Sequence, residues 1–75
     1  MGKLKILSGK EVCKILYENG FVQVRQKGSH IITQRKLLEE TITVPVPNHP
    51  EIKFGTLQSI IRQSRLPKEL FETGK

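Results

Sequence analysis

The spacing of apolar residues changes twice along this chain, and that change limits the folds the chain can adopt. Apolar residues recur every three or four positions in 12–16, which is the interval of a helix. From 21 to 46 they form β-branched stretches or alternate with polar residues, as in strands, and in 57–61 the helical interval returns. The pattern therefore predicts a helix, a group of strands and a second helix, in that order.

The first helix has sequence signals at both of its ends. Ser8 and Glu11 have the spacing of a capping box, in which each side chain accepts a hydrogen bond from the backbone amide of the other. Gly20 provides the residue that most easily adopts the left-handed conformation after a helix. These signals predict a helix over residues 9–19.

Two strands joined by a tight turn are predicted next. Val22 and Val24 alternate with polar residues in the stretch 21–26, and β-branched residues dominate 30–34. Gly28-Ser29 between the two stretches is a turn signal. We therefore expect a hairpin in which residue 30 follows the turn directly.

A third strand is predicted over 41–46, with its even-numbered apolar residues on the buried side. Pro45 has no N–H to donate, so this strand should lie at the edge of the sheet with Pro45 facing outward. The connection over 35–40 is longer than a tight turn and has room for a short helical extension.

The second helix is predicted over 55–65, and one further turn over 66–71 folds Leu70 and Phe71 back onto the core. A chain of 75 residues is long enough for one domain, here 1–75. An antiparallel sheet of three strands with both helices on one face buries the apolar side of every element. The predicted fold is therefore α+β, with the α-β-β-β-α layout of a double-stranded-RNA-binding domain.

The charge of the chain is concentrated in its first half. The sequence holds 13 Lys and Arg against 7 Asp and Glu, a net charge of +6. Residues 1–36 carry eight of the basic and two of the acidic residues, whereas 37–75 carry five of each. Lys10 and Lys14 lie one turn apart on the solvent side of the first predicted helix. Such a field attracts phosphate backbones, although a basic balance that serves only solubility explains the same numbers.

Several classes of protein are disfavoured by the composition. The single Cys13 excludes an internal disulfide and a cysteine-built zinc site, and it fits the margin of the core. No apolar run approaches about 18 residues, and no signal-peptide core is present. We therefore expect a cytoplasmic protein with no metal, no small-molecule cofactor and no membrane contact. A domain of this size also lacks room for a deep cavity, which favours a polymer substrate.

The residues around the first turn are the strongest candidates for chemistry. The amides at Gly28 and Ser29 can approach and hold a phosphate, and His30 is a side-chain type that exchanges protons near neutral pH. RNA brings its own nucleophile, the 2′-hydroxyl, so His30 is a candidate acid or base, and Arg25 or Lys27 a candidate stabiliser of charge. A polar hairpin whose histidine only hydrogen-bonds a neighbour fits the same pattern, and a lone histidine does not decide between the two.

Two further side chains are weaker candidates. His49 lies between Asn48 and Pro50, where a turn residue is the simpler interpretation and a second acid or base the alternative. Tyr17 could stack on a base, but its place in the first helix favours packing. The polar side of the second helix, with Arg62 and Arg65, fits phosphate contact and simple solvation equally well.

Five segments of the chain, in the same order, resemble the HicA toxins, the small mRNA-cleaving partners of HicB antitoxins in bacterial and archaeal toxin–antitoxin pairs. They cover nearly the whole chain: Ser8-Gly-Lys-Glu-Val12, Asn19-Gly-Phe-Val22, Arg25-Gln-Lys-Gly-Ser-His30, Thr43-Val-Pro-Val46, and Ile52-Lys-Phe-Gly-Thr-Leu57 with Ile60 and Ile61.

The resemblance implies a fold like that of double-stranded-RNA-binding domains and the toxin of a type II pair. It implies a metal-independent endoribonuclease that cleaves mRNA with a single catalytic histidine, which is His30 here. It also implies a HicB-like antitoxin that covers this histidine. A non-catalytic RNA-binding module on the same fold, or an adaptor that only docks a protein partner, are the alternatives from other functional classes.

Two segments depart from the family pattern. Residues 35–40 stand where a short Pro-Asp-Gly turn is usual, and Ser64-Arg-Leu66 stands where Ala-Gly-Leu is usual. Arg65 therefore replaces the glycine that would end the second helix.

Overall fold

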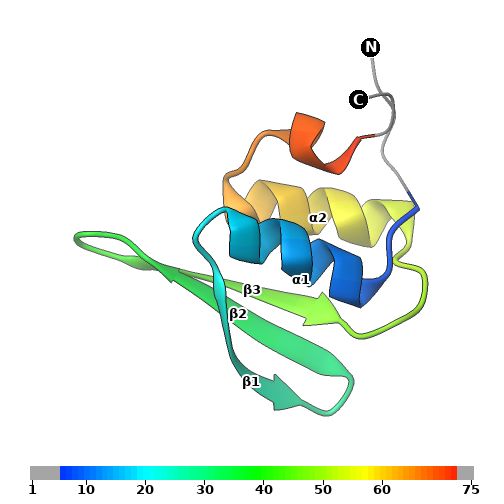
Figure 1. Ribbon diagram of the computed structural model, residues 1–75, viewed down its shortest axis with the longest axis horizontal. Helices are drawn as coiled ribbons and strands as arrows, with labels where there is room; N and C mark the ends of the chain where they lie inside the picture. The colour runs from blue at the N-terminus through cyan, green and yellow to red at the C-terminus, as the bar shows by residue number, and fades with distance from the viewer. Residues whose placement is uncertain (1–5, 73–75) are drawn as a thin grey trace.

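The computed structural model describes residues 6–72, and it has the predicted order of elements (Figure 1). The predicted domain limits at 1 and 75, and the basic residues Lys3 and Lys5, lie outside this range. The elements are, in chain order, α1 (Gly9–Glu18), β1 (Val22–Lys27), β2 (His30–Lys36), β3 (Thr41–Pro47), α2 (Phe54–Ser64) and the 3-10 helix η1 (Lys68–Phe71).

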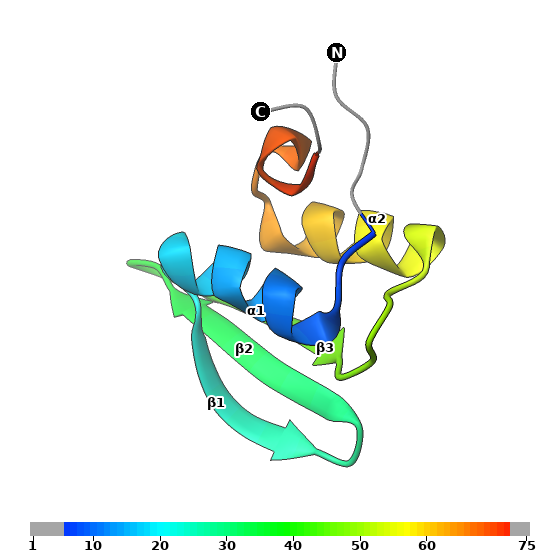
Figure 2. The ribbon, with the colours of Figure 1, turned by 45° about the vertical axis from the view of Figure 1, so that its right-hand side comes forward.

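The three strands form one antiparallel sheet in the order β1-β2-β3, with β2 in the centre. Helices α1 and α2 lie on the same side of this sheet, and no helix within residues 6–72 lies over the other side (Figures 1 and 2). β3 is an edge strand, as the proline in its sequence predicted, and Pro45 is exposed opposite Ile32. The predicted α+β fold is therefore confirmed.

Helix α1 begins with the capping box that the sequence predicted. The Ser8 amide donates to Glu11 Oε1 at 2.8 Å, and the Glu11 amide donates to Ser8 Oγ at 3.1 Å. The helix ends at Glu18, and Gly20 then has a φ of 98°, which only glycine adopts without a steric cost. The start and the stop of this helix are thus encoded locally.

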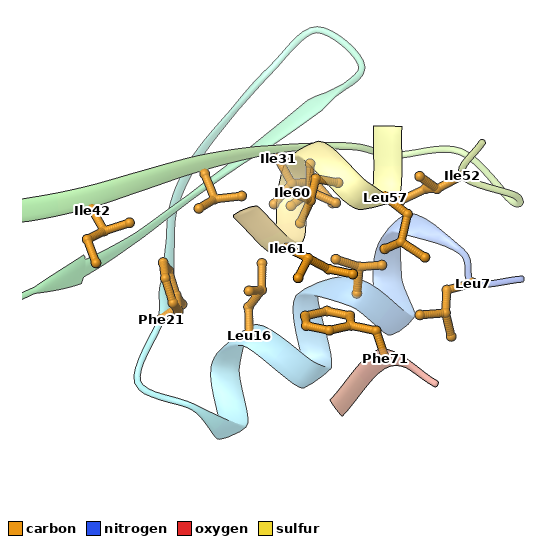
Figure 3. Packing of buried hydrophobic residues seen from close by; sticks show 13 residues of the cluster. Leu7, Leu16, Phe21, Ile31, Ile42, Ile52, Leu57, Ile60, Ile61 and Phe71 are labelled. Carbon is orange, nitrogen blue, oxygen red and sulfur yellow. The ribbon is translucent and has the colours of Figure 1, made fainter. Parts of the chain in front are cut away.

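The core fills the space between the covered face of the sheet and the helices (Figure 3). Phe21 and Phe71, which lie far apart in the sequence, are both buried in it. Thr33 is a polar residue of the core, and its hydroxyl donates to the Val44 carbonyl at 2.8 Å, so that its burial leaves no unpaired donor. The apolar members of the core are Leu7, Val12, Leu16, Phe21, Ile31, Ile42, Val44, Val46, Ile52, Leu57, Ile60, Ile61 and Phe71.

The connection between β2 and β3 differs from the prediction. β2 continues to Lys36, and the chain then turns over 37–40, where the Leu37 amide donates to the Glu40 carbonyl at 2.7 Å. The helical extension for which the connection had room does not form, because pairing of Lys36 with Thr41 lengthens the ladder at the expense of the connection. Leu38 is 99% exposed at the tip of this hairpin.

Val22 and Val24 are 50% and 46% exposed, because β1 is an edge strand whose residues are all exposed. The expectation that Tyr17 packs is wrong, since its side chain is 70% exposed. Helical spacing places it away from the buried stripe of α1.

Arg65 stands in the left-handed conformation after α2, with a φ of 62°. A side chain in this conformation costs roughly 1–2 kcal/mol relative to the right-handed one. The Arg65 guanidinium makes a two-pronged ion pair with Glu40, at 3.0 Å and 2.9 Å, which joins the end of α2 to the β2–β3 turn. The two segments that depart from the family pattern therefore contact each other.

The Glu40–Arg65 pair predicts a pH dependence of stability. The hydrogen bond from Arg65, and then the attraction of its charge, lower the pKa of the Glu40 carboxyl below the ordinary value of 4.5. A lowered folded-state pKa contributes stability above pH 4.5 that is lost as the pH falls through the folded-state value. Glu40→Gln should remove this part of the acid dependence, measured as urea unfolding at several pH values. If the free energy of unfolding of Glu40→Gln fell with acid pH as steeply as that of the parent protein, the pair would add nothing to stability.

The start of α1 predicts a second stability effect. A Cβ on Gly9 would overlap the Pro47 carbonyl oxygen and would lie 3.0 Å from the Asn48 Cα. Gly9→Ala should therefore destabilise the fold by about 1–3 kcal/mol, the usual cost of overpacking. Gly55→Ala is the matched control, since its Cβ would meet nothing within 4 Å, and it should gain about 0.5–1 kcal/mol from lower chain entropy. Equal unfolding midpoints for the two variants would show that the close approach of Pro47 does not restrict residue 9.

Candidate nucleic-acid interface

The turn between β1 and β2 is built around one glycine. Lys27 and His30 pair directly, so Gly28 and Ser29 form a two-residue turn. Gly28 has a φ of 59°, and Ser29 has no positive φ, which is the pattern of a type II′ hairpin turn. The Ser29 carbonyl accepts a hydrogen bond from the Asn48 amide at 2.7 Å, so the turn is also held from the end of β3.

The alternation of β2 decides which face His30 occupies. Ile31 and Thr33 are buried beneath the helices, and successive side chains of a strand point to opposite faces. His30, Ile32 and Gln34 therefore lie on the face without helices, which we call the open face. His30 is exposed there, at the start of the central strand.

Cross-strand pairing places cations beside His30. Side chains directly opposite each other in an antiparallel pair lie on the same face of the sheet. Lys27 is opposite His30, and Arg25 is opposite Ile32, so both cations lie on the open face. On its other side, His30 is opposite Pro47 of β3. The structure thus brings three of the predicted site residues together on one surface.

A β-bulge is responsible for this grouping. Val22 is opposite Gln34 and Gln23 is opposite Thr33, but the next pair joins Arg25 to Ile32, so β1 has one extra residue there. Under strict alternation, Arg25 would share the covered face with Gln23. The bulge moves it, and with it Lys27, to the open face.

The two predicted lysines of α1 lie elsewhere. Lys10 and Lys14 are exposed on the helix layer, on the opposite side of the sheet from the open face. The Gly9 amide donates to the His49 carbonyl at 2.8 Å, which places the start of α1 next to the end of β3. The predicted cations therefore form two groups, and only one of them shares a face with His30.

His49 lies in the loop that follows β3, and its side chain is exposed. The backbone of this loop is held on two sides, by the bond between Asn48 and Ser29 and by the bond between Gly9 and His49. These contacts agree with the interpretation of His49 as a loop residue.

Lys36 is a further cation of the open face that the sequence did not predict. The sequence pattern assigns it to the connection, but the longer β2 includes it and alternation puts it on the open face with Gln34. Polar residues such as these give little β-strand signal, so only the pairing with β3 reveals their place. None of the paired residues of the three strands is acidic, so no carboxylate of the sheet offsets these cations.

Within residues 6–72, no group of three or more His, Cys, Asp or Glu side chains is arranged to hold a metal ion. No helix in that range is both long and apolar enough to cross a membrane. Cys13 packs against the margin of the core, as predicted, and burial raises the pKa of its thiol. That shift works against a reactive thiolate.

Comparison with known families agrees with this architecture. Residues 9–66 match the family model described as the HicA toxin of bacterial toxin–antitoxin systems. The chain belongs to the HicA toxin family. The match runs from the first residue of α1 to two residues beyond α2, so it includes the Gly28-Ser29 turn and His30. No curated protein matches the chain. The family resemblance found in the sequence motifs is therefore confirmed.

The turn geometry predicts which residues can replace Gly28. Its positive φ penalises a β-branched side chain, whereas asparagine adopts this conformation more readily. Gly28→Val should lower the free energy of unfolding by roughly 1–2 kcal/mol, and Gly28→Asn by clearly less. The cost comes from the backbone conformation and not from a clash, because a Cβ at this site meets nothing within 4 Å. Urea unfolding measures both. Equal losses for the two variants would mean that the backbone conformation does not limit this position.

Proposed function

We propose that this member of the HicA family is the endoribonuclease toxin of a type II pair, and that it cleaves mRNA on its open face with His30 as the catalytic residue. The observation that carries the proposal is the placement of His30: exposed, directly after a tight glycine turn, and beside Lys27 and Arg25 on a sheet whose paired residues include no acidic one. An imidazole next to cations suits a reaction at a phosphodiester.

The proposed reaction uses the nucleophile that RNA itself carries. The phosphate contacts the amides of Gly28 and Ser29 and the Lys27 ammonium, which neutralise the charge that develops on its oxygens. His30 removes the proton of the 2′-hydroxyl, the 2′-oxygen bonds to phosphorus, and the bond from phosphorus to the 5′-oxygen breaks. The products are a 2′,3′-cyclic phosphate and a 5′-hydroxyl, whose proton comes from the imidazolium or from water. This chemistry requires no metal ion.

We further propose that a HicB-like antitoxin neutralises the toxin by covering His30. Family membership supports an antitoxin partner, and the exposure of His30 supports direct occlusion. A partner that reaches over the open face would exclude RNA and histidine chemistry together. The proposed compartment is the cytoplasm, where mRNA and the antitoxin are present.

His30→Ala tests the catalytic assignment. Histidine acid–base catalysis typically contributes about 10²–10⁴-fold, so the variant should lose cleavage by that factor while its affinity for RNA changes little. Purified protein is incubated with a long mRNA, with and without chelator, and binding is measured separately at low salt. His49→Ala is the matched control, an exposed histidine of the loop that should retain activity.

The outcomes separate the candidate functions. Full cleavage by His30→Ala would show that another group catalyses the reaction. Salt-dependent binding by the parent protein without any cleavage would favour the non-catalytic RNA-binding module. No binding even at low salt would favour an adaptor that docks only a protein partner.

A further inference from the structure

The open face contains a hollow that the proposed reaction does not use. It has a volume of about 430 Å³ and lies at the end of the β1–β2 ladder farthest from the Gly28-Ser29 turn. Its lining comes from the start of β1, the end of β2 and the loop before them: Gly20, Val22, Val24, Gln34 and Lys36.

We propose that this hollow is a subsite for one unstacked base of single-stranded RNA, and that it determines where the toxin cleaves. The proposal rests on the ribonuclease function above and adds the form of the substrate and the source of sequence preference. Three features support it: the position of the hollow, its chemistry and the charge around it.

The hollow is in line with His30. Gln34 and His30 lie on the same face of β2 four residues apart, which corresponds to about 13 Å along a strand. Arg25 is opposite Ile32, midway between them. An extended RNA strand whose phosphate lies at His30 therefore passes Arg25 and reaches the hollow within a few nucleotides.

Two side chains give the hollow an apolar wall. Val22 and Val24 are about half exposed on an edge strand, although β-branched side chains usually pack against a neighbour. The face of a nucleobase is flat and apolar, and burial against such a surface is favourable for every base. The uncovered valines are thus suited to contact a base without selecting which one.

Gln34 supplies the group that can select. Its amide donates one hydrogen bond to Thr43 Oγ1 at 3.3 Å, which restrains the side chain on the open face. A glutamine amide has two donor hydrogens and one acceptor oxygen, so Gln34 can still pair with the edge of a base. Lys36 beside it provides a cation for the adjoining phosphate.

The same features favour a single strand over a duplex. Bases in a duplex are stacked and paired, so their faces cannot enter a hollow on a sheet, whereas unstacked bases can be read on their edges. The cations at positions 25, 27 and 36, with no carboxylate among the paired residues of the sheet, favour a polyanion along the whole face.

The test compares cleavage maps of the full chain on a long mRNA for two glutamine variants. Gln34→Leu keeps a similar shape and removes the amide, and Gln63→Leu is the matched control, an exposed glutamine on α2. We expect the parent protein and the control to prefer one base at a fixed distance from the cut. In Gln34→Leu this preference should fall by about tenfold, the effect of one hydrogen bond, while the overall rate changes less.

Val22→Thr tests the apolar wall of the hollow. This nearly isosteric change should weaken cleavage at all sites alike, and thermal unfolding verifies that each variant is folded.

A second readout keeps this inference separate from the ribonuclease proposal. Short single-stranded oligonucleotides of different base composition are bound to His30→Ala, with and without Gln34→Leu. If the parent protein does not cleave, base-dependent binding that Gln34→Leu removes would support the subsite and reject the nuclease. Identical cleavage maps, or equal binding of all oligonucleotides, would overturn the subsite alone. A Gln34→Leu effect confined to affinity for the antitoxin would also overturn it, because the hollow would then serve the protein partner.

Discussion

The coverage of only one face of the sheet is the constraint on which the rest of this structure depends. Two helices and a 3-10 turn supply enough apolar surface to bury one side of β2 and β3, and the described part of the chain has no further element for the other side of the sheet. The buried residues of β2 are accordingly apolar or internally hydrogen-bonded, as Ile31 and Thr33 are. The residues that alternate with them are released from packing, and His30 is one of these.

The bulge in β1 converts this constraint into a charged surface. One extra residue between Gln23 and Arg25 changes the face of everything that follows it in the strand. The shift gathers cations around an imidazole, on the sheet face where Val22 and Val24 remain exposed. A structure that only maximised burial would avoid both features. Their coexistence on the open face supports the view that this face binds a ligand, and that it does so with apolar as well as charged groups.

The contact between Arg65 and Glu40 shows how two departures from a family pattern can compensate. An arginine in a left-handed position is less favourable than the usual glycine, and a hairpin tip of this length is less restrained than a short turn. The ion pair connects both features across the surface. Since both side chains are about half exposed, its contribution to stability is modest.

The local signals of the sequence determined most of the fold. The capping box at Ser8, the glycines at 20 and 28, and the proline at 45 each depend on neighbouring residues only, and each was found where predicted. The candidate site was predicted as a segment, with His30 after a glycine turn. Only the tertiary structure decided that Arg25 and Lys27 share a face with His30 while Lys10 and Lys14 do not, and that Lys36 belongs to a strand. The physical reason is that the face of a strand residue depends on its register with a partner strand. One bulged residue reverses that face without leaving any signal in the local sequence.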